Sequence, residues 1–389
     1  MITLSTPNLI GNEKKYLNKC IDGNWVSTAG EYINLFEKKI SKFTGSKYTI
    51  ACINATAALD ISLKLLKVEE GDEVIAPTLT FISPINAILY NKASPIFMDC
   101  DEFYNIDISK TLEFIKTQTF FKNGYTYNNK TKQKIKAIII VHVWGNAVWL
   151  DELYKICKHK NIEILEDASE SLGTIYTKGK FKSKHTGTIG KIGCISFNGN
   201  KIITSGGGGA IITNDRVIAD KALYLTTQAK DDPIRYIHDE VGYNLRLTNI
   251  NAAVGLAQKK KIKKILKLKR NIYNNYKKEI YKIKGYEFAK TPEYASNNHW
   301  LNILRVNSLS KDKTNLDLLK FFSSNKVQTR PVWYLNHLQK KLKKYQVYKI
   351  KRANLMVKNS LCIPSSSHLT NKQFNTIIKL LKKFLHNDV

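Results

Sequence analysis

The spacing of hydrophobic residues changes along the chain. Between residues 12 and 70 the pattern predicts helices only, in the segments 13–21, 29–45 and 55–71. From Asp72 the apolar residues form short continuous runs, which read "DEVIAP", "SPIFMDC", "KAIIIVHVW", "IEILEDA", "KIGCISFN" and "GGAIITN". Such runs, separated by helical segments, are typical of strands that are covered on both faces. The pattern predicts an α/β fold with a mostly parallel sheet.

The pattern changes again near Thr248, where we expect a long helix to begin. Helices and strand candidates such as "HWLNILRV" follow it. A chain of 389 residues is too long for one ordinary core, so two domains are expected. We predict a large domain over residues 1–250 and a small C-terminal domain over residues 251–389.

One segment interrupts the alternation of helices and strands. Residues 120–139 read "FFKNGYTYNNKTKQKIKAII" and predict an inserted β-hairpin. We place its turn at "NNK", residues 128–130, because Asn is frequent in hairpin turns.

The charge of the chain is strongly positive, with 62 Lys and Arg against 32 Asp and Glu and a formal net charge of +30. A nucleic-acid binder would gather these residues on one face, and a membrane-surface protein would place them on an amphipathic helix. In the Lys-rich stretch 258–278, however, Ile262, Ile265 and Ile272 recur at helical spacing, so the Lys residues occupy the opposite face. This favours a solvated surface, with no nucleic-acid or membrane partner, whose field would still attract a phosphorylated substrate.

The six cysteines lie far apart, with no CxxC pair and no His at ligand spacing. Neither a disulfide framework nor a metal site is predicted, and we expect reduced thiols in the core. The chain has no run of 18 apolar residues, and its first residues show no basic segment followed by an apolar stretch. We therefore expect a cytoplasmic protein.

Two stretches after predicted strands are candidates for ligand binding, because ligands bind beyond the carboxyl ends of parallel strands. Residues 54–60, "NATAALD", open a helix whose first N–H groups could hold an anion, although a plain helix cap is the alternative. Residues 196–209, "SFNGNKIITSGGGG", end in four glycines, which indicate close backbone approach or positive φ, with a flexible surface loop as the alternative. Lys201 could supply a reactive amine here.

The stretch 166–173, "EDASESLG", directly follows a predicted buried strand. A carboxylate at Asp167 needs a cationic partner to offset its loss of water. The protonated ring nitrogen of pyridoxal phosphate would serve, and this cofactor also has an aldehyde for a Lys and a phosphate for a helix N-terminus. The chain supplies a candidate for each group: Asp167, Lys201 and the helix that begins near Asn54.

Together these stretches resemble the sugar-nucleotide aminotransferases of the DegT/DnrJ/EryC1/StrS family, from about Leu4 to about Pro364. Within the family the chain is most similar to the legionaminic-acid pathway group. The residues that carry the resemblance are "NWVSTAG", "PTLTFISPINAI", "FMDCD", the inserted hairpin, "EDASESLG", "SFNGNKIITSGGGG", "TTQAKDDP", "YIH", "VGYNLRLTNINAAVGLAQ" and "TRPVW". The fold implied is that of fold-type I pyridoxal phosphate enzymes, with a mixed, mostly parallel seven-stranded sheet in the large, cofactor-binding domain and a smaller C-terminal α/β domain.

The resemblance implies roles for individual residues. Lys201 would bond to the cofactor aldehyde and then move protons, and Asp167 would pair with the pyridinium nitrogen. Ser196, with the backbone N–H groups of Thr56 and Ala57, would hold the cofactor phosphate.

Two further residues complete the cofactor contacts that the resemblance implies. Phe81 would stack on the cofactor ring, and Asn244 would reach the phosphate in the neighbouring subunit, so that a homodimer is the functional unit.

Two positions depart from the family pattern. Ala55 stands where many members have Gly, so the phosphate turn must accommodate a methyl group. Glu170 stands where many members have a Gln that donates a hydrogen bond to the phenolic oxygen of the cofactor, and an ionised Glu cannot donate. We predict that Glu170 is protonated beside that oxygen or turned towards another donor. Glu166, the neighbour of Asp167 on the strand, would face the opposite side and support the site only indirectly.

The reaction implied is transfer of an amino group from L-glutamate to C4 of a nucleotide-linked 4-keto-6-deoxy hexose, expected to be UDP-linked with an N-acetyl group. Candidate contacts to the sugar nucleotide are His238, Arg330 and His337, although a single His is more often structural. Two alternatives remain. Some relatives are dehydratases with His in place of Lys201, and the chain could also be a non-catalytic basic binding protein on the same fold.

Overall fold

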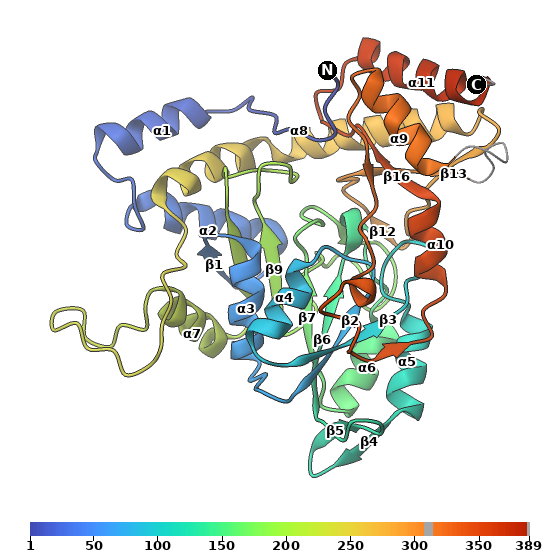
Figure 1. Cartoon of the computed structure of the whole chain (residues 1–389). Coiled ribbons are helices and arrows are strands. Elements are labelled where there is room, and N and C mark those ends of the chain that lie inside the picture. Colours follow the sequence, from blue (N-terminus) through green and yellow to red (C-terminus); the bar gives the residue numbers. More distant parts are fainter. Residues whose placement is uncertain (307–313, 387–389) are drawn as a thin grey trace.

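The computed structural model describes residues 1–306 and 314–386 (Figure 1). Its centre is a large sheet whose strands, within these residues, lie in the order β1-β10-β9-β7-β6-β2-β3-β15. In this order β10 runs in the direction opposite to the other strands, which are parallel to one another. The strands are β1 (Tyr48–Cys52), β2 (Glu73–Pro77), β3 (Ser94–Met98), β6 (Ile135–Val141), β7 (Glu163–Asp167), β9 (Ile192–Ser196), β10 (Gly209–Thr213) and β15 (Val347–Tyr348).

The mixed, mostly parallel sheet confirms the predicted fold class. The resemblance implied seven strands, whereas the sheet has eight within the described residues. All six runs chosen from their apolar residues are strands of this sheet, and no run predicted β1 or β15. β1 lies between two helices, in the segment 12–70 where the pattern predicted helices only. The eighth strand, β15, has two residues and comes from the C-terminal part of the chain, so its membership depends on tertiary packing.

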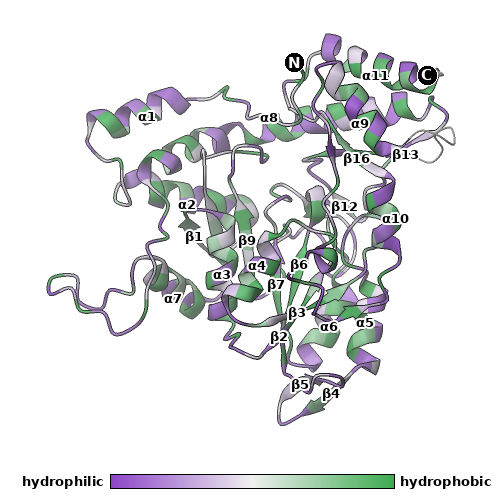
Figure 2. Cartoon of the chain, in the orientation of Figure 1, coloured by the Kyte–Doolittle hydropathy of each residue, from purple (hydrophilic) through white to green (hydrophobic). Residues whose placement is uncertain are grey.

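Alternate residues of the inner strands serve two different cores. On β6, Ile138 and Ile140 pack with residues of α5 and α6, whereas Ala137 and Ile139 pack with residues of α2, α3, α4, α7 and α8. Figure 2 shows the hydrophobic residues gathered on these strands. The helices around the sheet are α1 (Glu13–Asp22), α2 (Glu31–Thr44), α3 (Ala55–Leu65), α4 (Ser83–Tyr90), α5 (Ile108–Thr117), α6 (Asp151–His159), α7 (Arg216–Thr226) and α8 (Asn249–Ile280).

The predicted hairpin is present, but its turn was placed wrongly. Strands β4 (Thr119–Lys122) and β5 (Tyr125–Asn128) pair antiparallel, with Asn123 and Gly124 between them. Both turn residues have positive φ, 50° and 78°. Asn-Gly is the sequence that a two-residue turn of this kind favours. The "NNK" at 128–130 instead follows the second strand.

The C-terminal part contains a second, antiparallel sheet in the order β11-β13-β16-β14. The strand predicted at "HWLNILRV" is β13. The elements are β11 (Tyr286–Phe288), β13 (Asn302–Val306), β14 (Arg330–Pro331), β16 (Ser360–Ile363), α9 (Asn315–Ser324), α10 (Arg352–Lys358) and α11 (Asn371–His386). A short pair, β8 (Ile175–Tyr176) and β12 (Ala295–Ser296), joins the two parts.

Helix α8 belongs to both parts of the molecule. It begins where predicted, with the Thr248 side chain accepting a hydrogen bond from the Asn251 N–H. Its first half contributes Ile262 to the core of the large sheet, and its second half contributes Tyr276 to the core of the small sheet. Most of its Lys residues face solvent as predicted, but Lys269 is only 3% exposed.

The domain division after residue 250 stays a prediction, and contacts cross it in both directions. Ile2 pairs with Val327 beside the small sheet, while β15 joins the large sheet. Asp99, at the end of β3, accepts hydrogen bonds from the backbone N–H groups of residues 351–353 at the start of α10. The two parts are therefore fastened to each other at several points.

All six cysteines are buried and none forms a disulfide. Across residues 1–306 and 314–386, no helix has the length and apolar character that crossing a membrane requires.

Candidate active site

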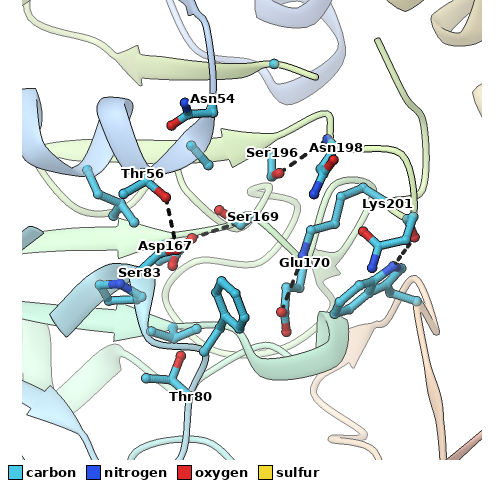
Figure 3. Close-up of a pocket in the computed structure, with 18 of the residues that line it drawn as sticks. Asn54, Thr56, Thr80, Ser83, Asp167, Ser169, Glu170, Ser196, Asn198 and Lys201 are labelled. Atoms are coloured by element: carbon cyan, nitrogen blue, oxygen red, sulfur yellow. Dashed lines mark hydrogen bonds and ion pairs between the residues drawn. The ribbon is translucent and has the colours of Figure 1, made fainter. Parts of the chain in front are cut away.

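A pocket of about 300 Å³ lies at the carboxyl ends of the large-sheet strands (Figure 3). Asp167 ends β7, Ser196 ends β9, and the N-terminus of α3 faces the same space. The chain thus brings together three stretches that are far apart in sequence. The lining residues are Asn54, Ala55, Thr56, Leu59, Thr80, Phe81, Ser83, Pro84, Val141, Asp167, Ser169, Glu170, Ser196, Asn198, Asn200, Lys201, Gly207, Gly208, Trp300 and Trp333.

One end of the pocket offers donors to an anion. Asn54 caps α3 by accepting a hydrogen bond from the Ala57 N–H at 2.8 Å. That N–H is therefore taken, and Ala57 is not among the lining residues, whereas Ala55 and Thr56 are. First-turn N–H groups have no partner inside a helix, so the α3 terminus remains a favourable place for negative charge. The Ser196 hydroxyl lies at the same pocket.

The glycine run closes this end tightly. A Cβ atom at Gly209 would lie 2.5 Å from the backbone of Asn54 and Ala55, so the strand after the run approaches the α3 terminus without room for a side chain. Gly206 and Gly208 have φ of +83° and +157°. The prediction of close approach and positive φ is confirmed, and the alternative of a loose surface loop is wrong.

The other end of the pocket holds the buried charges. Lys201 Nζ lies 3.4 Å from Glu170 Oε1, and Glu170 Oε2 accepts a hydrogen bond from the Trp144 N–H at 2.7 Å. Figure 3 shows Lys201 extending from its loop towards Glu170. Burial raises the pKa of Glu170 to about 7, against the opposing effects of Lys201 and the Trp144 N–H. Burial likewise raises the pKa of Asp167, whose carboxylate accepts a hydrogen bond from the Ser169 N–H at 3.0 Å.

Glu166 points away from this pocket, as the alternation along a strand predicts. Its carboxylate is fully buried and accepts hydrogen bonds from the N–H groups of Gly187, Ile189 and Gly190 at 2.6–2.8 Å. The His142 Nε2 lies 2.9 Å away and donates to it, because the other ring nitrogen accepts from the Val148 N–H. Glu166 therefore fastens the loop that precedes β9.

Aromatic side chains form a wall that the sequence did not reveal. Trp300 is 3% exposed, and its ring centroid lies 3.7 Å from Lys201 Nζ. Trp333 also lines the pocket, 6.5 Å between ring centroids from Phe81. Both tryptophans come from the C-terminal part of the chain. No spacing or neighbouring residue type in the sequence links them to Lys201, so the fold was needed to find them.

Besides Ala57, four predicted contacts do not line this pocket in the single chain. Asn244 is exposed, on the segment beside β1, and His238 lies in the loop that extends from the body between α7 and α8 (Figure 1). Arg330 is exposed at β14. His337 is engaged with Thr78, its Nδ1 lying 2.6 Å from the hydroxyl oxygen, and burial lowers its pKa. Their predicted roles stay predictions.

The described residues, 1–306 and 314–386, contain no cluster of three or more His, Cys, Asp or Glu side chains that could hold a metal ion. The charges at the pocket are thus those of Asp167, Glu170 and Lys201.

Known proteins resemble this chain over nearly its whole length. A GDP-perosamine synthase of Escherichia coli O157:H7 is 34% identical, with 98% of each chain covered. A UDP-4-amino-4,6-dideoxy-N-acetyl-beta-L-altrosamine transaminase of Campylobacter jejuni is 28% identical, again with 98% of each covered. The Helicobacter pylori aminotransferase PseC, involved in the biosynthesis of pseudoaminic acid, shares the fold with a TM-score of 0.86 at 21% identity and 99% coverage of each chain. Residues 7–382 match the family model itself, and the chain therefore belongs to the DegT/DnrJ/EryC1/StrS aminotransferase family.

Proposed function

We propose that this chain transfers an amino group from L-glutamate to C4 of a nucleotide-linked 4-keto-6-deoxy hexose. The observation that carries the proposal is the meeting of Lys201, Asp167 and the α3 N-terminus in one pocket. Pyridoxal phosphate is the cofactor of the family's aminotransferases, and each of these three groups matches a different part of it.

The pocket fits this cofactor in its donor set. Asp167 is 4% exposed, and its carboxylate accepts hydrogen bonds from the N–H and the hydroxyl of Ser169, which are neutral donors. A buried carboxylate also needs a cationic partner. A pyridinium nitrogen would supply the missing cation. The α3 terminus, Thr56 and Ser196 would hold the phosphate, with the tight approach at Gly209 fixing their spacing.

The cofactor supplies an electron sink that makes the hydrogen on the amino-bearing carbon of glutamate acidic. Lys201 Nζ would take that proton and return it at the neighbouring cofactor carbon, and in the second half-reaction it would move a proton in the reverse direction. Asp167 would keep the ring nitrogen protonated, and the two tryptophans would exclude water. Lys201, in place of the His of the dehydratases, argues against the dehydratase alternative.

Glu170 would act as a proton donor beside the reacting groups. Its pKa of about 7 leaves a large protonated fraction at neutral pH, and its contacts to Lys201 and to the Trp144 N–H hold it in place. The protonated form could donate to the phenolic oxygen of the cofactor, as Gln does at the corresponding position of many relatives. Glu170→Gln should then keep the cofactor spectrum but remove part of its pH dependence. An unchanged pH dependence would contradict this role.

The substrate in this proposal is a UDP-linked 4-keto-6-deoxy-N-acetylhexosamine, and the product a 4-amino sugar nucleotide for a nonulosonic acid, such as legionaminic acid, or another surface glycan. The resemblance of the motifs to the legionaminic-acid group supports it. The relatives at 34% and 28% identity are named for a GDP-linked and a UDP-linked sugar respectively, so both nucleotides belong in the test. The free, buried thiols suit the reducing cytoplasm, where we propose that the enzyme works.

A homodimer is part of the proposal, with Asn244 contacting the cofactor phosphate of the other subunit. The loop between α7 and α8 exposes Ile234, Tyr236 and Val241 at 86%, 72% and 78%. Apolar side chains this exposed are typical of surfaces that bind another protein. Asn244 lies where this loop returns to the body.

The test is an absorbance spectrum of the protein with pyridoxal phosphate, recorded before and after addition of L-glutamate. We expect a visible band from the bond to Lys201, which glutamate converts to the pyridoxamine form. Discharge by UDP-linked and GDP-linked 4-keto-6-deoxy sugars would then identify the acceptor.

Lys201→Ala should show neither the band nor the conversion. The matched control is Lys191→Ala, which removes a Lys that pairs with Glu163 outside the pocket. An identical response of Lys201→Ala and the wild type would overturn the proposal and favour the non-catalytic binding protein.

A further inference from the structure

The catalytic Lys has an aromatic neighbour that belongs to the other part of the molecule. The indole ring of Trp300 lies with its centroid 3.7 Å from Lys201 Nζ, within the range of a cation–π contact, while Glu170 Oε1 lies 3.4 Å from the same amine. Trp offers the strongest such contact among the aromatic residues. The amine therefore lies between a ring face and a carboxyl group.

Several contacts fix the position of this indole. Its Nε1–H donates to the carbonyl of Asn200, the residue before Lys201, at 2.6 Å. The Trp300 N–H donates to Asn298 Oδ1 at 3.0 Å, and the Asn298 amide in turn donates to the carbonyl of Glu170 at 2.8 Å. The ring is thus tied to the backbone beside both Lys201 and Glu170.

The backbone carbonyl of Trp300 also accepts a hydrogen bond. The buried amine of Lys269, on α8, donates to the Trp300 carbonyl at 2.8 Å and to the Ser365 carbonyl at 2.6 Å. Placing a Lys amine in the interior is costly, and here it joins two segments of the small part to α8. Hydrogen bonds of its indole, its backbone N–H and its carbonyl therefore fix the position of Trp300 beside the pocket.

We propose that Trp300 is a positioning residue for Lys201, whose protonated amine rests on the indole face whenever it is not bonded to the cofactor. The inference rests on the proposed role of Lys201. In both half-reactions the freed amine takes up a proton and must keep it beside the reacting carbons. The ring face stabilises the ammonium form and prevents the side chain from swinging away.

Other charged groups also face this amine. Among the described lining residues these are Glu170, at 3.4 Å, and Asp167, whose charge interacts with Lys201. Both carboxylates stabilise the ammonium form when ionised, so the contribution of the ring has to be measured against them. Repeating the comparison in a Glu170→Gln background removes the nearer of the two.

The experiment follows capture of pyridoxal phosphate by the apoprotein as a function of pH. Only the neutral amine attacks the aldehyde, so the rate of band formation rises with pH to a plateau. Loss of the ring destabilises the ammonium form, and Trp300→Leu should move the midpoint down by about 0.4–1.5 pH units. Trp300→Phe keeps a weaker ring face and should move it less, in the same direction. A purely structural role would slow capture at every pH and leave the midpoint unchanged.

A second readout is the single-turnover reaction with L-glutamate. Its rate constant should fall about 2- to 30-fold in Trp300→Leu, with the half-saturating glutamate concentration unchanged. Trp149→Phe is the matched control, since the Trp149 indole donates to Glu152 and does not line the pocket. If Trp300→Leu does not fold, Trp300→Phe decides the question.

A midpoint that stays in place or rises in the Trp300 variants overturns the inference. Failure of the wild-type protein to form a band with the cofactor would instead overturn the proposed function, and the two failures are therefore distinguishable.

Discussion

Two adjacent carboxylates on β7, Glu166 and Asp167, are both buried and yet have opposite surroundings. Glu166 accepts four hydrogen bonds, three from backbone N–H groups and one from His142. Asp167 accepts hydrogen bonds from a single residue, the N–H and the hydroxyl of Ser169, and faces the pocket. Burial alone would raise both pKa values, but the His142 and backbone donors hold that of Glu166 below its ordinary value, while that of Asp167 is raised.

The difference distinguishes a carboxylate that stabilises the fold, that of Glu166, from one that is available to a ligand, that of Asp167. A buried carboxylate whose partners all come from the protein contributes to the fold, and removing it leaves donors unpaired. A buried carboxylate with too few partners costs stability until a cationic ligand arrives. The number of protein partners, and not burial itself, distinguishes Asp167, which we propose pairs with the cofactor, from Glu166.

The largest effect is expected from removing the carboxylate of Glu166, whose hydrogen-bond partners all come from the protein. Glu166→Ala should lower the free energy of unfolding by about 3–5 kcal/mol, because three N–H groups and the His142 N–H lose their acceptor. Denaturant unfolding of the apoprotein measures this. Glu166→Gln keeps one acceptor oxygen and should lose less. Equal stability of Glu166→Ala and the wild type would contradict the assignment of Glu166 to the fold.

The second largest effect is expected from neutralising Asp167, the carboxylate that faces the pocket. Asp167→Asn should lower the rate of the glutamate half-reaction by about 10²- to 10³-fold, because an amide cannot stabilise a positive ring nitrogen. The apoprotein should be as stable as the wild type or more so, since a poorly partnered buried charge is removed. Single-turnover kinetics and denaturant unfolding of the same preparation give both numbers. A variant that loses stability but keeps its rate would reverse the comparison.

A third prediction concerns the pH dependence contributed by Glu170. Its raised pKa means that the folded apoprotein holds this proton more tightly than the unfolded chain does. The resulting stability is complete below the unfolded pKa, near 4.3, and is lost as the pH rises through about 7. Relative to the wild type, Glu170→Gln should therefore gain up to about 3 kcal/mol of unfolding free energy between pH 4 and pH 8. Parallel stability curves for the two proteins would rule this out.

The smallest effect is expected for a partly exposed pair that joins the first residue of β7 to the residue before β9. Lys191 lies 3.1 Å from Glu163, with exposed fractions of 44% and 27% for the two side chains. Solvent screens such a pair, so Lys191→Ala should change the unfolding free energy by less than about 1 kcal/mol and leave cofactor binding unchanged. Denaturant unfolding and the cofactor spectrum check both. A loss as large as that in Glu166→Ala would mean that burial and partner number do not explain the difference within β7.

The sequence alone predicted the inner strands of the large sheet and the pocket residues at their ends. Apolar runs identified the inner strands because these are buried on both faces, and the last residues of two of them, Asp167 and Ser196, line the pocket. Alternation along β7 also predicted that Glu166 faces away. Local pattern is sufficient where one strand and the residue after it determine the position.

Other features depend on contacts between distant segments and left no local signal. The N–H groups that satisfy Glu166 come from residues 187–190, and Trp300 reaches Lys201 from almost one hundred positions along the chain. The start of α3 is different, because the sequence left open whether it binds an anion or is a plain helix cap, and the hydrogen bond from the Ala57 N–H to Asn54 shows that the cap is present. Local propensity cannot show which donors the fold leaves available.

Helix α8 sets a limit on how this enzyme could be recombined with its relatives. Because one continuous helix supplies both cores, and its Lys269 holds the segment that carries Trp300, an exchange of C-terminal halves at residue 250 would pair a foreign helix with the native large sheet. A chimera meant to alter acceptor choice would keep α8 with its own large sheet and replace loops beyond it. The helix therefore couples the folding of the two parts, so that the C-terminal part is not an exchangeable module.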